Sequence, residues 1–343
     1  MNFYFSRSKQ VENFYGLHEH RSEDNYIYLD DGWTQKDDYF FKGISSSWCK
    51  IYFGHSLRIE TNKLRDFPIY HNNKDVSNFV VMDQNVPVNG MVSFNDSVHI
   101  TYDGGFYPRL PNDVLTFKEC KDLLYDAVIE NVGTFAANNT KKILMPDQNG
   151  IDTLTVRSVF DHLGVGYKLF RLNNEKPSLT QLGTKLAEDH WGFAQIREDD
   201  GCVVVGGYYG DEWGLRNPYY VNALLSNRGV SLIDCFDATG DCYMKKYFEK
   251  YRTKCENQTA LSREQVMSQI CNDFQIWHLH GTTFLSPLKH YSLLSLLSAD
   301  TDTIISQVTD AKLSKAIIQD CNPTLLVEID VHKNQDDPSW FPE

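Results

Sequence analysis

Residues 142–153 read KILMPDQNGIDT, an apolar run that passes into a polar turn and then into a second apolar segment. The pattern predicts a buried strand over 141–145 and a helix from about Thr153 to Leu163, with Gly164 as its C-cap. A further strand is expected over 166–172. The order strand, turn, helix, strand predicts a parallel α/β sheet with right-handed crossovers.

The same alternation continues on both sides of this segment. Thr116 is the expected N-cap of a helix whose apolar face runs from Cys120 to Val128. Further along, we expect helices over 179–186 and 218–225, a strand over 202–206, and a mainly helical chain beyond about Tyr243. Parallel sheets bind ligands beyond the carboxyl ends of their strands. The turns at 146–153 and 206–214 are therefore predicted to carry the chemistry.

The first hundred residues have a different character, with short β-branched or aromatic runs separated by turn residues. Pro108 and Pro111 mark the expected linker. We therefore predict two domains, a β-rich one over 1–108 and an α/β one over 113–343. The expected strands lie at 26–29, 48–53, 56–60, 68–70, 79–82 and 98–102.

Composition restricts the class of protein. The 343 residues carry a formal net charge of −13, and 41% of them are hydrophobic, which argues against a disordered chain and against a general binder of nucleic-acid backbones. There is no apolar run long enough for a membrane span and no secretory h-region, so we expect a cytoplasmic protein without a membrane partner. The eight cysteines form no Cys-x-x-Cys pair, which favours reduced thiols over a zinc site.

The first turn has groups suited to an anion. Amides at a helix N-terminus bind phosphate, and Gly150 would let them approach it closely. The hydroxyl of Thr153 and the amides of Gln148 and Asn149 could add donors. Asp152 would need a magnesium ion or a ribose hydroxyl between itself and a phosphate. The alternative is an ordinary turn in which Asp152 or Thr153 caps the helix.

Residues 148–153, QNGIDT, resemble the pyrophosphate-binding loop of the ATP pyrophosphatase superfamily, Ser-Gly-Gly-x-Asp-Ser between a strand and a helix. The likeness is most specific to the asparagine synthetase branch. Gly150, Asp152 and Thr153 keep the second Gly, the Asp and a hydroxyl. Gln148 and Asn149 depart from the first Ser and Gly. An Asn can adopt the left-handed conformation that Gly favours, which would preserve the loop shape.

The second turn follows the apolar run 203–205 and reads GGYYGDEWG over 206–214. Adjacent carboxylates can hold a divalent cation, although a solvated acidic turn is the plainer interpretation. Gly210, Asp211 and Glu212 resemble the Gly-x-Gly-Ala-Asp-Glu loop of the asparagine synthetase family, lacking only the Ala. The two loops occur in the order that this family requires.

Weaker likenesses extend along the chain. Residues 64–70, LRDFPIY, resemble a shortened signature of the family's glutaminase domain, and 283–287, TFLSP, stand where the family has Pro-Phe-Leu-Asp. Residues 310–318 resemble a helix that precedes a loop with a catalytic lysine, for which Lys333 is the candidate. A tail lysine beside Asp336 and Asp337 is the alternative. Asn2 replaces the glutaminase cysteine, so we expect no glutamine hydrolysis.

The resemblance implies an α/β protein in which a shortened, β-rich Ntn-hydrolase-like domain precedes an adenine nucleotide α-hydrolase-like domain with a helical C-terminal part. It implies ATP and Mg²⁺ as cofactors, and small-molecule carboxylate and amine substrates. Gln148, Asn149, Gly150, Asp152, Thr153 and Gly210 would bind the nucleotide, Asp152, Asp211 and Glu212 the metal, and Lys333 would be catalytic.

The implied reaction is activation of a carboxylate as an acyl-adenylate, followed by amide formation. The alternative is an inactive relative that keeps the fold as a nucleotide-binding or protein-interaction module. The altered first loop favours this alternative, whereas the retained acidic residues favour the enzyme.

Overall fold

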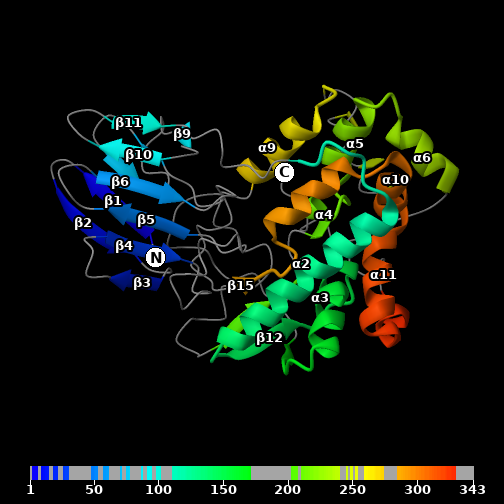
Figure 1. Ribbon diagram of the computed structural model, residues 1–343, viewed down its shortest axis with the longest axis horizontal. Helices are drawn as coiled ribbons and strands as arrows, with labels where there is room; N and C mark the ends of the chain where they lie inside the picture. Colours follow the sequence, from blue (N-terminus) through cyan, green and yellow to red (C-terminus); the bar gives the residue numbers. More distant parts are fainter. Residues whose placement is uncertain are drawn as a thin grey trace.

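The computed structural model describes residues 110–170, 202–207, 210–239, 259–273 and 284–329, together with residues 245, 248–249 and 252–253. Between residues 2 and 101 it describes the backbone of short strands. Figure 1 shows these strands grouped apart from the helices and the sheet that follow them in the chain. The expected strand over 79–82, the expected helix over 179–186, and Lys333 lie outside the described residues.

The N-terminal strands pair antiparallel within two sheets, of order β2-β1-β8-β7-β9 and β11-β10-β6-β5-β4-β3. In the second sheet Ile51 pairs with both Ile27 and Ile59, so these three isoleucines lie side by side across three neighbouring strands. The strands are β1 (Asn2–Ser6), β2 (Lys9–Phe14), β3 (His18–Arg21), β4 (Tyr26–Asp30), β5 (Trp48–Tyr52), β6 (Leu57–Thr61), β7 (Tyr70–His71), β8 (Asp75–Ser77), β9 (Val86–Pro87), β10 (Met91–Phe94) and β11 (Val98–Thr101).

The next sheet contains β12 (Lys142–Pro146), β13 (Lys168–Phe170), β14 (Cys202–Val205) and β15 (Phe284–Leu285), in the order β13-β12-β14-β15. Every neighbouring pair is parallel, and Leu144 pairs with Lys168 on one side and Val204 on the other. The chain leaves β12 toward β13 and later returns to β14 on the opposite side. The gap between β12 and β14 is therefore a topological switch point, where open α/β sheets bind ligands.

Helix α2 (Phe117–Asn138) begins as its sequence predicts. The Thr116 hydroxyl accepts a hydrogen bond from the Glu119 amide, and the Glu119 carboxylate accepts one from the Thr116 amide at 2.8 Å. This capping box satisfies two amides at the helix start. The N-cap prediction for Thr116 is confirmed.

Helix α3 (Ile151–His162) begins earlier than expected. Its N-cap is Gly150, which has no side chain to cap the helix, so the alternative in which Asp152 or Thr153 is the cap is wrong. Most of its residues are buried, and it packs against α2 and α11. At its other end the C-cap is Leu163 and not the expected Gly164, which follows it with a left-handed φ of +66° that a glycine reaches without steric cost.

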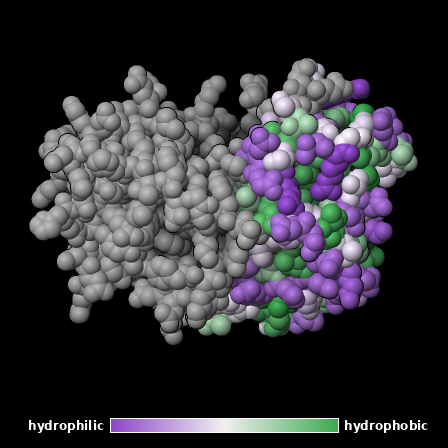
Figure 2. Space-filling view, turned by 45° about the horizontal axis from the view of Figure 1, so that its top comes forward, coloured by the Kyte–Doolittle hydropathy of each residue, from purple (hydrophilic) through white to green (hydrophobic). Residues whose placement is uncertain are grey.

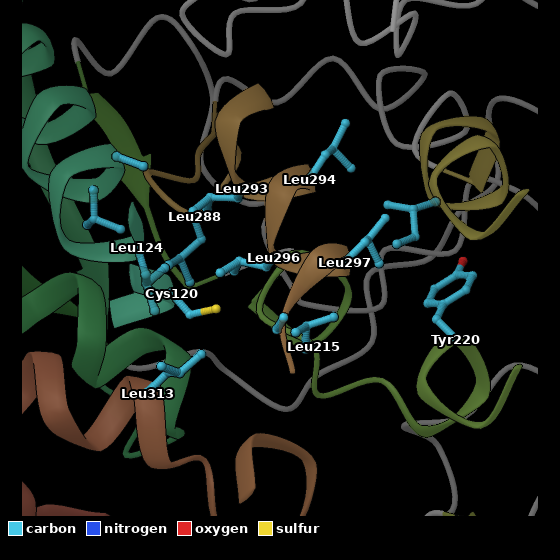
Figure 3. Packing of buried hydrophobic residues seen from close by; sticks show 14 of the residues in the cluster. Cys120, Leu124, Leu215, Tyr220, Leu288, Leu293, Leu294, Leu296, Leu297 and Leu313 are labelled. Carbon is cyan, nitrogen blue, oxygen red and sulfur yellow. The ribbon is translucent and has the colours of Figure 1, made fainter. Parts of the chain in front are cut away.

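The remaining helices follow β14 in the chain. They are α4 (Gly210–Trp213), α5 (Pro218–Ser226), α6 (Leu232–Thr239), α9 (Arg263–Asp273), α10 (Thr301–Asp310) and α11 (Lys312–Cys321), with 3₁₀ helices η5 (Tyr291–Ser298) and η6 (Pro323–Glu328). Figure 3 shows the side chains that meet around η5, among them Leu296 and Leu297 from η5, Leu215 from the turn after α4 and Tyr220 from α5. All four belong to one buried cluster.

The described surface is mixed in character. On the face in Figure 2, hydrophilic residues alternate with small hydrophobic patches. Within the described residues, the exposed large hydrophobic side chains include Val114, Leu163 and Val327. In that part of the chain, none of the helices combines the length and the apolar character needed to cross a membrane.

The Pro111 end of the expected linker packs against the helical part of the protein and forms hydrogen bonds with it. Leu110 is buried, and Nη1 of Arg263 donates to the Pro111 carbonyl. Leu115 donates to the Ser298 carbonyl at 2.9 Å, and its own carbonyl accepts from Asp300 at 2.8 Å. This segment is therefore a packed part of the helical region.

Candidate functional site

The two predicted turns meet at the switch point. The backbone of Gly207, just after β14, lies against the backbone of Asp152 and Thr153 in the first turn of α3. A Cβ atom on Gly207 would lie less than 3.0 Å from Asp152 and Thr153, and one on Gly210 less than 3.0 Å from the Asp152 carboxylate carbon. Glycine at 207 and 210 is thus what allows this approach.

A buried arginine joins the acidic residues of the two turns. Nη1 of Arg216 lies 2.7 Å from both Oδ1 and Oδ2 of Asp152 and 3.4 Å from Oδ1 of Asp211. The Arg216 side chain is 5% exposed, compared with 20% for Asp152 and 41% for Asp211. A guanidinium buried this deeply needs anionic partners, and the two carboxylates supply them.

The turn after α4 holds Arg216 in place. Its amide donates to the Asp211 carbonyl at 2.8 Å, and the Asn217 amide donates to the same oxygen at 2.6 Å. The preceding residue, Leu215, has a left-handed φ of +59° although it is not glycine, and it is almost fully buried. Its burial in the core offsets the backbone strain. Asn217 then caps α5 by accepting from the Tyr219 amide at 3.0 Å.

The site disfavours negative charge on Asp152. Burial is the main cause, and it raises the pKa of Asp152 to about 6, with a smaller contribution in the same direction from Asp211. Arg216 opposes both through its charge and its hydrogen bonds. With both carboxylates ionised, the three side chains carry a net charge of −1.

The other predicted residues differ in their exposure. Gln148 and Asn149 are partly exposed in the loop after β12, Gly150 is exposed, and Thr153 is buried. Among the described non-glycine residues only Leu215 and Ala311 have a positive φ, so Asn149 does not take the left-handed conformation that would have preserved the loop shape. Gly210 is buried against Asp152. The backbone of Glu212 lies in α4, but its side chain is outside the described part of the chain.

A magnesium site would need free oxygen ligands on these residues. Mg²⁺ commonly binds one or two carboxylates together with water and phosphate oxygens. Here both oxygens of Asp152 already face the Arg216 guanidinium, which also reaches Asp211. Among the described side chains, no group of three or more His, Cys, Asp or Glu residues is placed to hold a metal ion. As they lie, the described residues do not fit a resident Mg²⁺.

Arg216 is the site residue that the sequence did not reveal. The available signal was a single basic residue shortly after the acidic pair Asp211 and Glu212, in the stretch GDEWGLRNP. Such a residue is usually solvated, and only the fold brings it within hydrogen-bonding distance of Asp152.

Comparison with known proteins adds no family. No family model matches the chain, and a search of curated proteins finds no match to it.

Proposed function

We propose that the protein activates a small-molecule carboxylate with ATP and transfers the resulting acyl group to an amine, without hydrolysing glutamine. The observation that carries the proposal is the contact between the turns after β12 and β14. Gly207 and Gly210 pack on Asp152, at the edge of the sheet where α/β proteins bind nucleotides. These are the two turns whose sequences resemble the nucleotide loops of the asparagine synthetase family.

The chemistry consists of two displacements. A carboxylate oxygen attacks the α-phosphorus of ATP, which forms the acyl-adenylate and releases pyrophosphate. The amine nitrogen then attacks the acyl carbon, and AMP leaves as a proton is lost from nitrogen. Amides of the first turn of α3 would bind phosphate oxygens. Mg²⁺ enters this proposal as the counter-ion that ATP brings with it.

The charge balance of the site sets a requirement on this mechanism. A net charge of −1 on Asp152, Arg216 and Asp211 repels a polyphosphate, so positive charge must come from other residues. Lys333 is the predicted source.

A second function is favoured by the same ion pairs. If Asp152 and Asp211 serve only to hold Arg216, the ion pairs at the switch point have a purely structural role. The protein is then an inactive relative that binds a nucleotide or a protein partner. The firm placement of Arg216, whose side chain is 5% exposed, supports this alternative.

Carboxylate-dependent exchange of labelled pyrophosphate into ATP separates the two functions. The ligase predicts exchange with at least one member of a carboxylate panel, and its loss in Asp152→Asn, because the Asp152–Arg216 ion pair positions the two turns that would bind the nucleotide. Asp302→Asn is a matched control, because Asp302 is exposed in the first turn of α10. ATP binding without exchange would favour the inactive relative. Absence of both ATP binding and exchange would rule out the ligase, and release of ammonia from glutamine would contradict the loss of glutaminase activity.

A further inference from the structure

The relation between Arg216 and the two carboxylates has a consequence for metal binding. A cation that bridged Asp152 and Asp211 would occupy the position of Nη1 of Arg216, which lies 2.7 Å from both Asp152 oxygens and 3.4 Å from Asp211. The two cations therefore compete for one place. Two positive charges at contact distance repel strongly where water is largely excluded.

Several contacts hold Arg216 in this place. Its side chain is buried, its amide donates to the Asp211 carbonyl, and its neighbour Leu215 holds a left-handed φ within the core. The turn that positions the guanidinium also positions Asp211. Displacement of Arg216 would thus disturb one of the two carboxylates that a metal would need.

We infer that Arg216 is the resident counter-cation of Asp152 and Asp211, and that it excludes a divalent metal from this pair in the ligand-free protein. The three side chains form an ion-paired joint between the turn after β12 and the turn after β14. Arg216 is a positioning residue, and it stands where the resemblance places Mg²⁺. The inference concerns the protein without nucleotide, so it holds or fails independently of the proposed ligase.

Mn²⁺ binding to the full-length protein without nucleotide tests the inference. Free Mn²⁺ is measured by electron paramagnetic resonance for the wild type, Asp152→Asn, Arg216→Gln and the Asp152→Asn/Arg216→Gln double variant. Asp152→Asn corrects for the weak binding expected of any surface with a net charge of −13. Removal of the guanidinium should tighten Mn²⁺ binding by at least about tenfold, and the double variant should lose this gain.

The wild type and Asp152→Asn are expected to bind Mn²⁺ equally weakly. The inference is overturned if the wild type binds one Mn²⁺ that Asp152→Asn loses, or if a folded Arg216→Gln binds no more tightly than the wild type. Circular dichroism establishes which variants fold. Should Arg216→Gln fail to fold, the comparison of the wild type with Asp152→Asn still decides between the two outcomes.

Discussion

Nη1 of Arg216 lies 2.7 Å from both carboxylate oxygens of Asp152, although 64 positions separate the two residues in the chain. The contact joins the first turn of α3 to the segment between α4 and α5, and a further approach of 3.4 Å adds Asp211. At the switch point of the sheet, the two turns are therefore held together by ion pairs as well as by the close packing of glycines.

Arg216→Ala should destabilise the protein more at high pH than at low pH. The substitution leaves two neighbouring carboxylates without their cation, which typically costs about 3–5 kcal/mol. The pKa of Asp152, already raised to about 6, should rise further without Arg216. When the pKa of a carboxyl group is higher in the folded than in the unfolded state, the protein loses stability as the pH rises from the unfolded-state pKa toward the folded-state pKa. Urea unfolding at pH 5 and pH 8 measures the difference.

Arg228→Ala provides the matched control for this prediction. The Arg228 guanidinium donates to the carbonyls of Ala299 at 2.8 Å and Leu297 at 3.3 Å, which do not titrate. Its removal should therefore destabilise the protein by a similar amount at both pH values. An equal pH dependence in the two variants would contradict the role assigned to Arg216.

Gly207→Ala should separate the two turns of the site. The added methyl group would overlap the backbone of Asp152 and Thr153, and overpacking of this kind usually costs about 1–3 kcal/mol. Gly150→Ala is the matched control, because its φ is −64° and a Cβ there meets no atom within 4 Å. Thermal unfolding compares the two variants. Equal stability of Gly207→Ala and Gly150→Ala would contradict close packing at Gly207.

His290 should make the protein less stable in acid. Burial lowers the pKa of His290 to about 4, and the Glu130 carboxylate, 3.7 Å away but largely exposed, does not compensate for it. The depressed pKa gives stability that is complete above pH 6.5 and decreases as the pH falls toward 4. Between pH 7.5 and pH 5 the loss should be about 2 kcal/mol.

His290→Asn isolates this contribution. Nδ1 of His290 caps η5 by accepting from the Ser292 amide at 3.2 Å, and an asparagine oxygen can replace that acceptor without titrating. The difference in unfolding free energy between variant and wild type should change with pH by this amount. A constant difference from pH 7.5 to pH 5 would show that His290 does not titrate on unfolding.

The described free thiols should react slowly in the native protein. Burial is the main cause that raises the pKa of Cys120 to about 12 and that of Cys321 to about 11, and it also raises the pKa of Cys235. The thiolate is the reactive form. At pH 8 the alkylation of Cys120 by iodoacetamide should be at least about 100-fold slower in native than in urea-unfolded protein. Peptide mass spectrometry gives the rate at each cysteine, and a native rate for Cys120 that equals its unfolded rate would refute the prediction.

Elements with a local signal were predictable. Thr116 predicts the start of α2, because a hydroxyl followed three residues later by a carboxylate caps a helix within one turn. Gly164 marks the end of α3 because it reaches a left-handed φ without cost. The start of α3 was misplaced because Gly150 gives no side-chain signal, and β15, with two residues, is too short to show a periodicity.

The sequence by itself determined the alternation of strand and helix over residues 116–170 and 202–226, and with it the two turns that carry Asp152 and Asp211. These features depend on neighbours within a few residues. The tertiary structure alone decided that Gly207 and Gly210 press against Asp152, that Asn149 does not take a left-handed conformation, and that Arg216 is the shared cation. The physical reason is that burial and charge pairing depend on which distant segments the fold brings together.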